Sequence, residues 1–190
     1  MDSGELDFRV LGPLAVVRDG SEVALGGPRQ RLVLALLLLN AGRVVAAERL
    51  VDLIWGESEP ATRTGPLRTY VWQLRRVLDA DPDPDGEAPG PVVSRGAGYL
   101  LDIDRSQVDS VRFETQFAAA RADMASGKPQ RALLRLDEAL GLWRGSAFAD
   151  LALAPPVANE ATRLDELFLG AKELRADLLL ATGQPGPVAA

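Results

Sequence analysis

Arginine is the residue type in this chain that could recognise a ligand through charge and hydrogen bonds. Between positions 68 and 76 arginine occurs three times in a stretch without an acidic residue, and Arg95 lies between two strand-like segments. A guanidinium group binds phosphate or guanine through paired, coplanar N–H donors. If these arginines share one surface, the chemistry that they support is the binding of nucleic acid.

Several other chemistries are excluded by the residue types that the chain lacks. It contains neither cysteine nor histidine, so it cannot form a disulfide, a classical zinc site or a Ser-His-Asp triad. Its two lysines, Lys128 and Lys172, do not belong to a phosphate-binding loop pattern. We therefore expect a protein that is not an enzyme and that uses no metal and no cofactor.

The overall charge argues against nucleic-acid binding, and its distribution weakens that argument. The net charge is −6, from 27 acidic and 21 basic residues, whereas a DNA-binding domain is usually basic. Between positions 25 and 80, however, eight arginines stand against five acidic residues. The acidic excess is concentrated at the N-terminus and at 79–87, so a local basic surface is still expected.

The sequence predicts neither an exported protein nor a membrane protein. The N-terminus has no basic region followed by an apolar run, which a signal peptide would have. The longest apolar run, 32–39, is much shorter than the roughly 20 residues that span a bilayer. The expected location is the cytoplasm, in association with the nucleoid.

The elements that must position the arginines follow from apolar patterns and turn residues. Apolar stretches at 8–11, 14–17 and 22–25 predict a small antiparallel sheet, with Asp19-Gly20 as one of its turns. Two helices are expected next, at 29–40 and 46–55, each ended by a glycine. The first of them contains the apolar run 32–39 and should be buried.

A third helix should carry three of the arginines on one side. At about 100° of rotation per residue, its apolar side consists of Leu67, Val71, Leu74, Val77 and Leu78, with Tyr70 at the edge. The opposite side consists of Arg68, Thr69, Trp72, Arg75 and Arg76. Proline is tolerated only in the first turn of a helix, so Pro66 places the start near 64 or 65.

A second hairpin should follow a loop at 80–91 that is rich in Asp, Pro and Gly. Its strands are expected at 91–94 and 99–103, with Arg95 at the tip. A sheet, three helices and such a hairpin form the layout of a winged helix. The third helix would then enter the DNA major groove, about 12 Å wide, and Arg95 would contact the backbone or the minor groove.

The second half of the chain predicts helices only. We expect them at 110–125, 130–143 and 158–181, with the side chain of Asp109 capping the first. The apolar stripe of the last helix consists of Leu164, Leu167, Phe168, Ala171, Leu174 and Leu178. The predicted fold class is α+β, with a winged helix-turn-helix domain over 1–104 and an all-α domain over 105–190.

Two further arginines are candidate DNA contacts. Arg29 and Arg31 lie in the first turn of their helix, where a cation opposes the helix dipole. A phosphate partner would remove that objection, and a local salt bridge would remove it equally well. Both interpretations stay open at this point.

Six stretches in the same order resemble the Streptomyces antibiotic regulatory proteins, a family of transcription activators. They are FRVLGPL (8–14), GPRQRLVLALLLL (27–39), LIWGE (53–57), RTYVWQLRRVL (68–78), RGAGYL (95–100) and EALGLWRG (138–145). The resemblance implies an OmpR-type winged helix followed by a bacterial transcriptional activator domain similar to tetratricopeptide repeats. It also implies a dimer on promoter direct repeats of antibiotic (secondary-metabolite) biosynthesis genes, and contact with RNA polymerase and its sigma factor.

The chain departs from the family pattern at three places. The residue that caps the second helix is usually serine and is Ala46 here, which weakens the helix start. Gly65-Pro66 and Trp72 are unusual in the third helix. Trp72 could contact a thymine methyl group or a sugar, or it could pack against a neighbouring protomer or the second domain.

A second function remains open for the chain. A protein-interaction scaffold, whose winged helix and helical repeats bind protein, is the alternative to DNA binding, and the acidic pI of about 4.8 favours it.

The end of the sequence repeats a pattern that occurs earlier. The helix-breaking pattern of Gly127-Lys-Pro129 recurs at Gly183-Gln-Pro185 without a helix after it. We therefore expect a truncated helical domain, in which the last helix lacks one partner.

Overall fold

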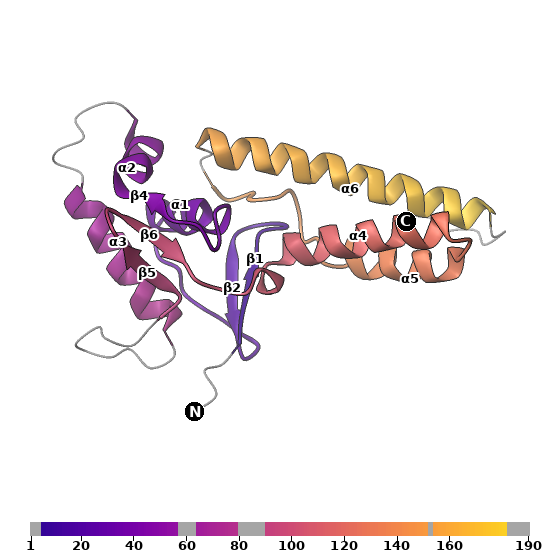
Figure 1. Cartoon of the computed structure of the whole chain (residues 1–190), viewed down its shortest axis with the longest axis horizontal. Helices are drawn as coiled ribbons and strands as arrows, with labels where there is room; N and C mark the ends of the chain where they lie inside the picture. Colours follow the sequence, from indigo (N-terminus) through magenta and orange to yellow (C-terminus); the bar gives the residue numbers. More distant parts are fainter. Residues whose placement is uncertain (1–4, 57–63, 80–89, 152–153, 182–190) are drawn as a thin grey trace.

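The α+β fold is confirmed by a computed structural model, which describes residues 5–56, 64–79, 90–151 and 154–181. Strands and three helices make up the first part, and helices alone make up the second (Figure 1). The winged-helix elements lie on one side, the long helices extend to the other, and strands β1 and β2 lie between them. None of the helices within these ranges is long and apolar enough to cross a membrane.

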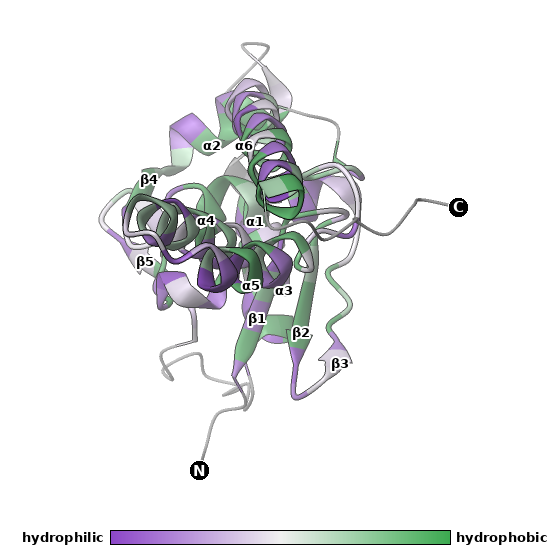
Figure 2. Ribbon diagram, turned by 90° about the vertical axis from the view of Figure 1, so that its right-hand side faces the viewer, coloured by the Kyte–Doolittle hydropathy of each residue, from purple (hydrophilic) through white to green (hydrophobic). Residues whose placement is uncertain are grey.

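The N-terminal sheet is antiparallel and has the order β1-β2-β3. Its strands are β1 (Leu6–Arg9), β2 (Ala15–Arg18) and β3 (Ser21–Glu22). Leu6 and Phe8 are buried, and β1 alternates between hydrophobic and charged residues, whereas β2 is mostly hydrophobic (Figure 2). Between β1 and β2, Gly12 has a φ of +144°, and a Cβ there would lie 3.0 Å from Cβ of Arg144. Glycine is needed here because the turn presses against the second half of the chain.

Helix α1 (Pro28–Leu38) is the central helix of the winged helix. After its first turn it is buried on all sides, as its apolar run at 32–39 predicted, with Leu32 to Leu38 at most 8% exposed. Helices α2 (Ala47–Trp55) and α3 (Thr64–Leu78) pack against it. Ala46 is the N-cap of α2 and makes no side-chain cap, as the sequence indicated.

The wing is a three-stranded sheet with the order β4-β6-β5. The predicted hairpin consists of β5 (Val92–Arg95) and β6 (Gly98–Leu101), and β4 (Val45–Ala46) adds a strand that the sequence did not predict. A two-residue strand is too short for an alternating pattern. The sequence nevertheless reflects the close approach of β4 to β6, because residue 98 is glycine and a Cβ there would lie 2.3 Å from the carbonyl oxygen of Val45.

The helical half begins with a short 3₁₀ turn, η2 (Arg105–Gln107). Helices α4 (Asp109–Ala125) and α5 (Pro129–Leu140) form a hairpin, and α6 (Pro155–Ala181) packs along it. The predicted stripe of α6 does face inward: Leu164, Ala171 and Leu178 are buried. The side away from the hairpin exposes Leu169 and Leu180 (58% and 80%). The repeated pattern at 183–185 lies outside the described residues.

The two halves are joined through Asp109, which does not do what the sequence predicted. The expected N-cap role is wrong, because Val108 is the N-cap of α4 and Asp109 is the first residue of the helix. Its buried carboxylate accepts hydrogen bonds from the backbone N–H groups of Val10 (2.7 Å) and Leu11 (3.2 Å), at the end of β1. Asp109 therefore binds the N-terminal sheet to the helical half.

The segment between α5 and α6 strengthens this junction. The N–H of Arg144 donates to Leu11 O (2.8 Å) and that of Phe148 to Val10 O (2.9 Å). The carboxylate of Asp150 accepts from Leu14 N (2.6 Å). One continuous hydrophobic core runs through both halves. The winged helix and the helical half are therefore held together by buried contacts.

Within the helical half, Asp123 ties α4 to α5. Its carboxylate accepts hydrogen bonds from Arg131 and Arg135 of α5, each with Nε at 2.9 Å, and the residue is 4% exposed. The hydrogen bond from Arg131 is the largest cause that lowers the pKa of Asp123, to about 2. Folding thus favours the ionised carboxylate.

Replacement of Asp123 by asparagine should make the stability of the chain less dependent on pH in the acidic range. Because folding lowers the pKa from 3.8 to about 2, the stabilising contribution is complete above about pH 4 and is lost as the pH falls toward 2. We expect Asp123→Asn to melt at a lower temperature than wild type near neutral pH. The two should converge near pH 2 when thermal unfolding is followed by circular dichroism.

Asp137→Asn is the matched control. Asp137 pairs with Arg175 at 2.5 Å, and its side chain is 47% exposed, so its pair should contribute little at any pH. If Asp137→Asn and Asp123→Asn lowered the melting temperature equally, Asp123 would not stabilise the packing of α4 on α5 more than an exposed ion pair does.

Candidate nucleic-acid interface

The exposed side of α3 is the centre of the candidate site. Leu67, Val71, Leu74 and Leu78 are at most 2% exposed and pack toward α1 and α2. Beyond the first turn, the side chains exposed to solvent are Arg68, Thr69, Trp72 and Arg76, which we call the recognition face. The apolar stripe fixes which side of α3 turns outward, so the predicted orientation of this helix is confirmed.

The start of α3 also follows from its sequence. The helix begins at Thr64, which puts Pro66 in the first turn, where a missing N–H leaves no hydrogen bond unmade. No acidic residue lies in the helix, and Arg75 and Arg76 are in its last turn, where cations are favoured by the dipole. The helix therefore presents positive charge without internal neutralisation.

Arg75 was predicted to share this surface, and its side chain turns toward the wing. Nε of Arg75 donates to the carbonyl oxygen of Val92 (2.7 Å), and an Nη donates to Oγ of Ser94 (2.8 Å). The residue is half-buried. Arg75 thus fixes the position of the wing relative to α3, a role that the helix periodicity alone could not indicate.

The wing places one cation beside α3. Arg95 is the last residue of β5, opposite Gly98 in the hairpin, and it is exposed. Gly96 follows it in a left-handed conformation (φ 56°), which lets the two strands reverse direction tightly. Because Arg75 anchors the base of β5 to α3, the predicted partnership between the wing and the third helix has a defined geometry.

The structure separates the two candidate arginines of α1. Arg31 is half-buried and forms an ion pair with Asp150 (2.5 Å), and it donates to Leu14 O. The salt-bridge interpretation therefore fits Arg31, which belongs to the junction of the two halves. Arg29 is exposed, with its guanidinium carbon 5.9 Å from the ring centre of Trp55, so it remains a candidate contact.

Trp72 lies in the middle of the recognition face. It is 57% exposed, and the guanidinium carbon of Arg76 lies 5.7 Å from the centre of its ring. The other aromatic residues of this region are half-buried, and Trp55 stacks on Tyr70 with ring centres 6.1 Å apart. In this chain, therefore, the helical half does not bury Trp72.

Ion pairing distinguishes the arginines of the site from eight others in the described ranges. The arginines that pair with carboxylates are Arg9, Arg31, Arg112, Arg131, Arg135, Arg144, Arg163 and Arg175. Across the ranges that the structure describes, Arg68, Arg76 and Arg95 form no such pair. Their donors are therefore available to an anionic ligand, although the whole chain is acidic.

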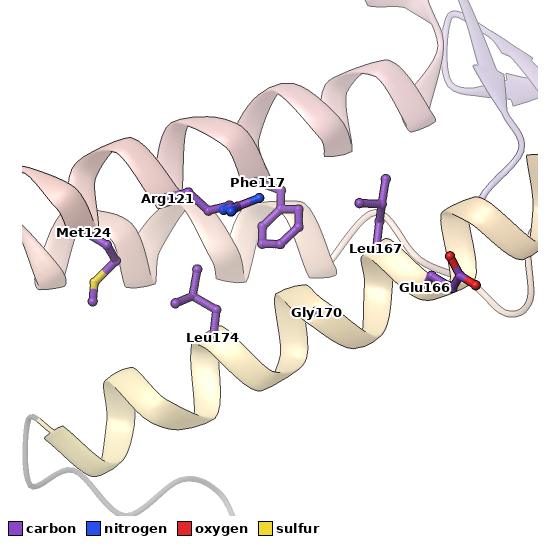
Figure 3. A pocket seen from close by; sticks show the side chains of 7 residues that line it. All are labelled: Phe117, Arg121, Met124, Glu166, Leu167, Gly170 and Leu174. Carbon is purple, nitrogen blue, oxygen red and sulfur yellow. The ribbon is translucent and has the colours of Figure 1, made fainter.

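Other features of the described residues lie away from α3 and the wing. No cluster of acidic side chains among them could hold a metal ion. A groove of about 440 Å³ lies between α4 and α6, lined by Phe117, Arg121, Met124, Glu166, Leu167, Gly170 and Leu174 (Figure 3). It is mainly apolar, and nothing in the structure indicates what would cover it.

Comparison with known proteins matches both halves to regulatory domains. Residues 20–101 match the family model for the C-terminal domain of transcriptional regulatory proteins, and residues 108–190 match that for the bacterial transcriptional activator domain. The chain is 37% identical to the regulatory protein AfsR of Streptomyces coelicolor over 96% of its length. It is 33% identical to the regulatory protein DnrI of Streptomyces peucetius over 94% of its length.

A solved structure has the same architecture. Mycobacterium tuberculosis EmbR, in complex with a low-affinity phosphopeptide, superposes with a TM-score of 0.85 at 34% identity over 95% of this chain. The chain spans only part of these proteins: 17% of AfsR, 66% of DnrI and 47% of the EmbR chain. The fold and the family type are therefore shared, while the relatives carry further sequence.

Proposed function

The chain belongs to the Streptomyces antibiotic regulatory protein family of transcriptional regulators, and from this premise we propose that it is a sequence-specific, DNA-binding activator. The observation that carries the proposal is the set of arginines without carboxylate partners on α3 and the wing, among the described residues. Helix α3 would lie in the major groove of double-stranded promoter DNA, and Arg95 would contact the backbone or the minor groove.

The finer parts of the proposal rest on the family. The targets would be direct repeats upstream of secondary-metabolite (antibiotic) biosynthesis genes, bound by a dimer in the cytoplasm, at the nucleoid. Activation would come from contact with RNA polymerase and its sigma factor. We assign DNA binding to 1–104 and the activator role to 105–190, since the matched regions end at 101 and begin at 108.

Binding to promoter DNA should weaken linearly in a plot of log affinity against log salt concentration. Each neutralised phosphate contributes a slope of about −0.9 for duplex DNA, because bound counterions are released. If at least two of the exposed arginines contact phosphates, the slope should be about −2 or steeper. Fluorescence anisotropy with a labelled promoter duplex, measured over a series of salt concentrations, gives this slope.

Two variants test whether the slope comes from the proposed surface. Arg95→Ala should make the slope shallower by about 0.9, as expected for a lost phosphate contact. Arg121→Ala removes an exposed arginine of α4, far from α3, and should leave the slope unchanged. A flat salt response in the wild type would favour the rival proposal, a scaffold that binds protein, over DNA binding.

A further inference from the structure

An exposed tryptophan on the recognition face lies outside the hydrophobic core. Trp72 is 57% exposed, whereas the leucines one turn away on the inner side are fully buried. A side chain of this size ordinarily contributes to a core or an interface. Its position between Arg68 and Arg76 makes it the one large apolar surface within a polar, positively charged face.

Trp72 is coupled to Arg76. The two are one helical turn apart, and the guanidinium carbon lies 5.7 Å from the ring centre, within the range of a cation–π contact. Among the described residues, no side-chain or backbone oxygen accepts a hydrogen bond from the guanidinium of Arg76, so its N–H donors remain available. The cation–π contact also reduces the number of side-chain conformations that Arg76 would lose on binding. Arg76 is thus prepared to donate two parallel hydrogen bonds.

The major groove offers one partner for each member of this pair. Guanine presents the two acceptors O6 and N7, which match the forked donors of arginine. Thymine presents a C5 methyl group, the apolar feature of the groove, which matches the free part of the indole. Four residues of helix advance about 6 Å, while base pairs are about 3.4 Å apart, so both contacts fall within about two base steps.

We propose that Trp72 and Arg76 form one reading unit, in which Arg76 selects a guanine and Trp72 selects the methyl group of a thymine next to it. The inference rests on the proposed function, since it needs α3 in the major groove. It makes Trp72 a specificity-determining residue and the organiser of Arg76.

The test separates the methyl group from every other property of the site. The 190-residue chain is used to select its preferred site from random-sequence duplex DNA. Each thymine of the selected site is then replaced in turn by uracil, which lacks only the methyl group. One replacement should weaken binding by the wild type about fourfold, the value expected for a single buried methyl group.

Substitutions in the chain then assign that effect. Trp72→Ala should bind the thymine and uracil duplexes equally, and Trp72→Phe should keep part of the difference. Arg76→Ala should lose selection of an adjacent guanine by about fivefold or more. Arg68→Ala is the matched control on the same face: it should bind more weakly and keep the fourfold difference.

Three outcomes would overturn the reading unit while leaving DNA binding intact. They are no uracil-sensitive thymine in the wild type, the same sensitivity in Trp72→Ala, or a lost guanine more than two base pairs from the thymine. A change in oligomeric state in Trp72→Ala, without loss of the uracil effect, would instead assign Trp72 to a protein interface. If the wild type enriches no sequence at all, the proposed function itself fails.

Discussion

Replacing both Arg68 and Arg76 with alanine should weaken sequence-specific DNA binding at least about 30-fold and leave thermal stability nearly unchanged. A forked arginine–guanine contact contributes about 1–3 kcal/mol, so two contribute about 2–6 kcal/mol. The residues are eight positions apart, about 12 Å along the helix, so their effects should be nearly additive. Both side chains are exposed and opposite the buried stripe of α3, so the core does not depend on them.

Arg75→Ala is the contrasting variant on the same helix. It removes hydrogen bonds to Val92 and Ser94, each of which contributes about 1 kcal/mol to stability. We expect a lower melting temperature together with weaker binding, because the wing is no longer fixed to α3. Electrophoretic mobility shifts give the affinity and circular dichroism gives the melting temperature. If the double variant melted at a clearly lower temperature than the wild type, the described orientation of α3 would be wrong. If it bound DNA as the wild type does, the two arginines would not be DNA contacts.

The recognition helix could be predicted from the sequence because its pattern is local. Leu67, Val71, Leu74 and Leu78 repeat at helical spacing, and this alone fixes which residues face outward. Pro66 fixes the start to within one or two residues. Periodicity thus predicted most of the site, including the exposure of Arg68, Trp72 and Arg76.

Contacts between distant segments could not be predicted in this way. The partners of Arg75 are 17 and 19 residues away, and that of Arg31 is 119 residues away. Arg31 has the same residue type and the same helical turn as Arg29, and only the folded chain distinguishes them. The expected cap at Asp109 failed for a similar reason: a local rule assigned its carboxylate to α4, whereas two N–H groups almost 100 residues away bind it.

Asp109→Ala should lower the free energy of unfolding by about 2–5 kcal/mol, because two buried N–H groups would lose their acceptor. The side chain is 2% exposed, and Arg144 Nη2 lies 3.7 Å from it, so a partly uncompensated cation would also remain. Such a loss is a large fraction of the total free energy of unfolding, which is about 5–15 kcal/mol for a protein domain. Asp137→Ala, which removes an exposed carboxylate, should change stability by less than about 1 kcal/mol in the same urea titration.

The pH dependence of this effect should run opposite to that of Asp123. Burial is the largest influence on Asp109 and raises its pKa above 3.8, despite the N–H donors of Val10 and Leu11. Folding therefore shifts Asp109 toward its protonated form, and this stabilising contribution is complete below about pH 3.8 and is lost as the pH rises through the raised pKa. Relative to Asp109→Asn, which cannot titrate, the wild type should gain stability on acidification, whereas it should lose stability relative to Asp123→Asn. Unfolding titrations of the three proteins at several pH values measure both differences, and equal trends would mean that burial does not control Asp109. Because Asp109 joins β1 to α4, the same variants should also reveal whether loosening that junction weakens DNA binding through α3.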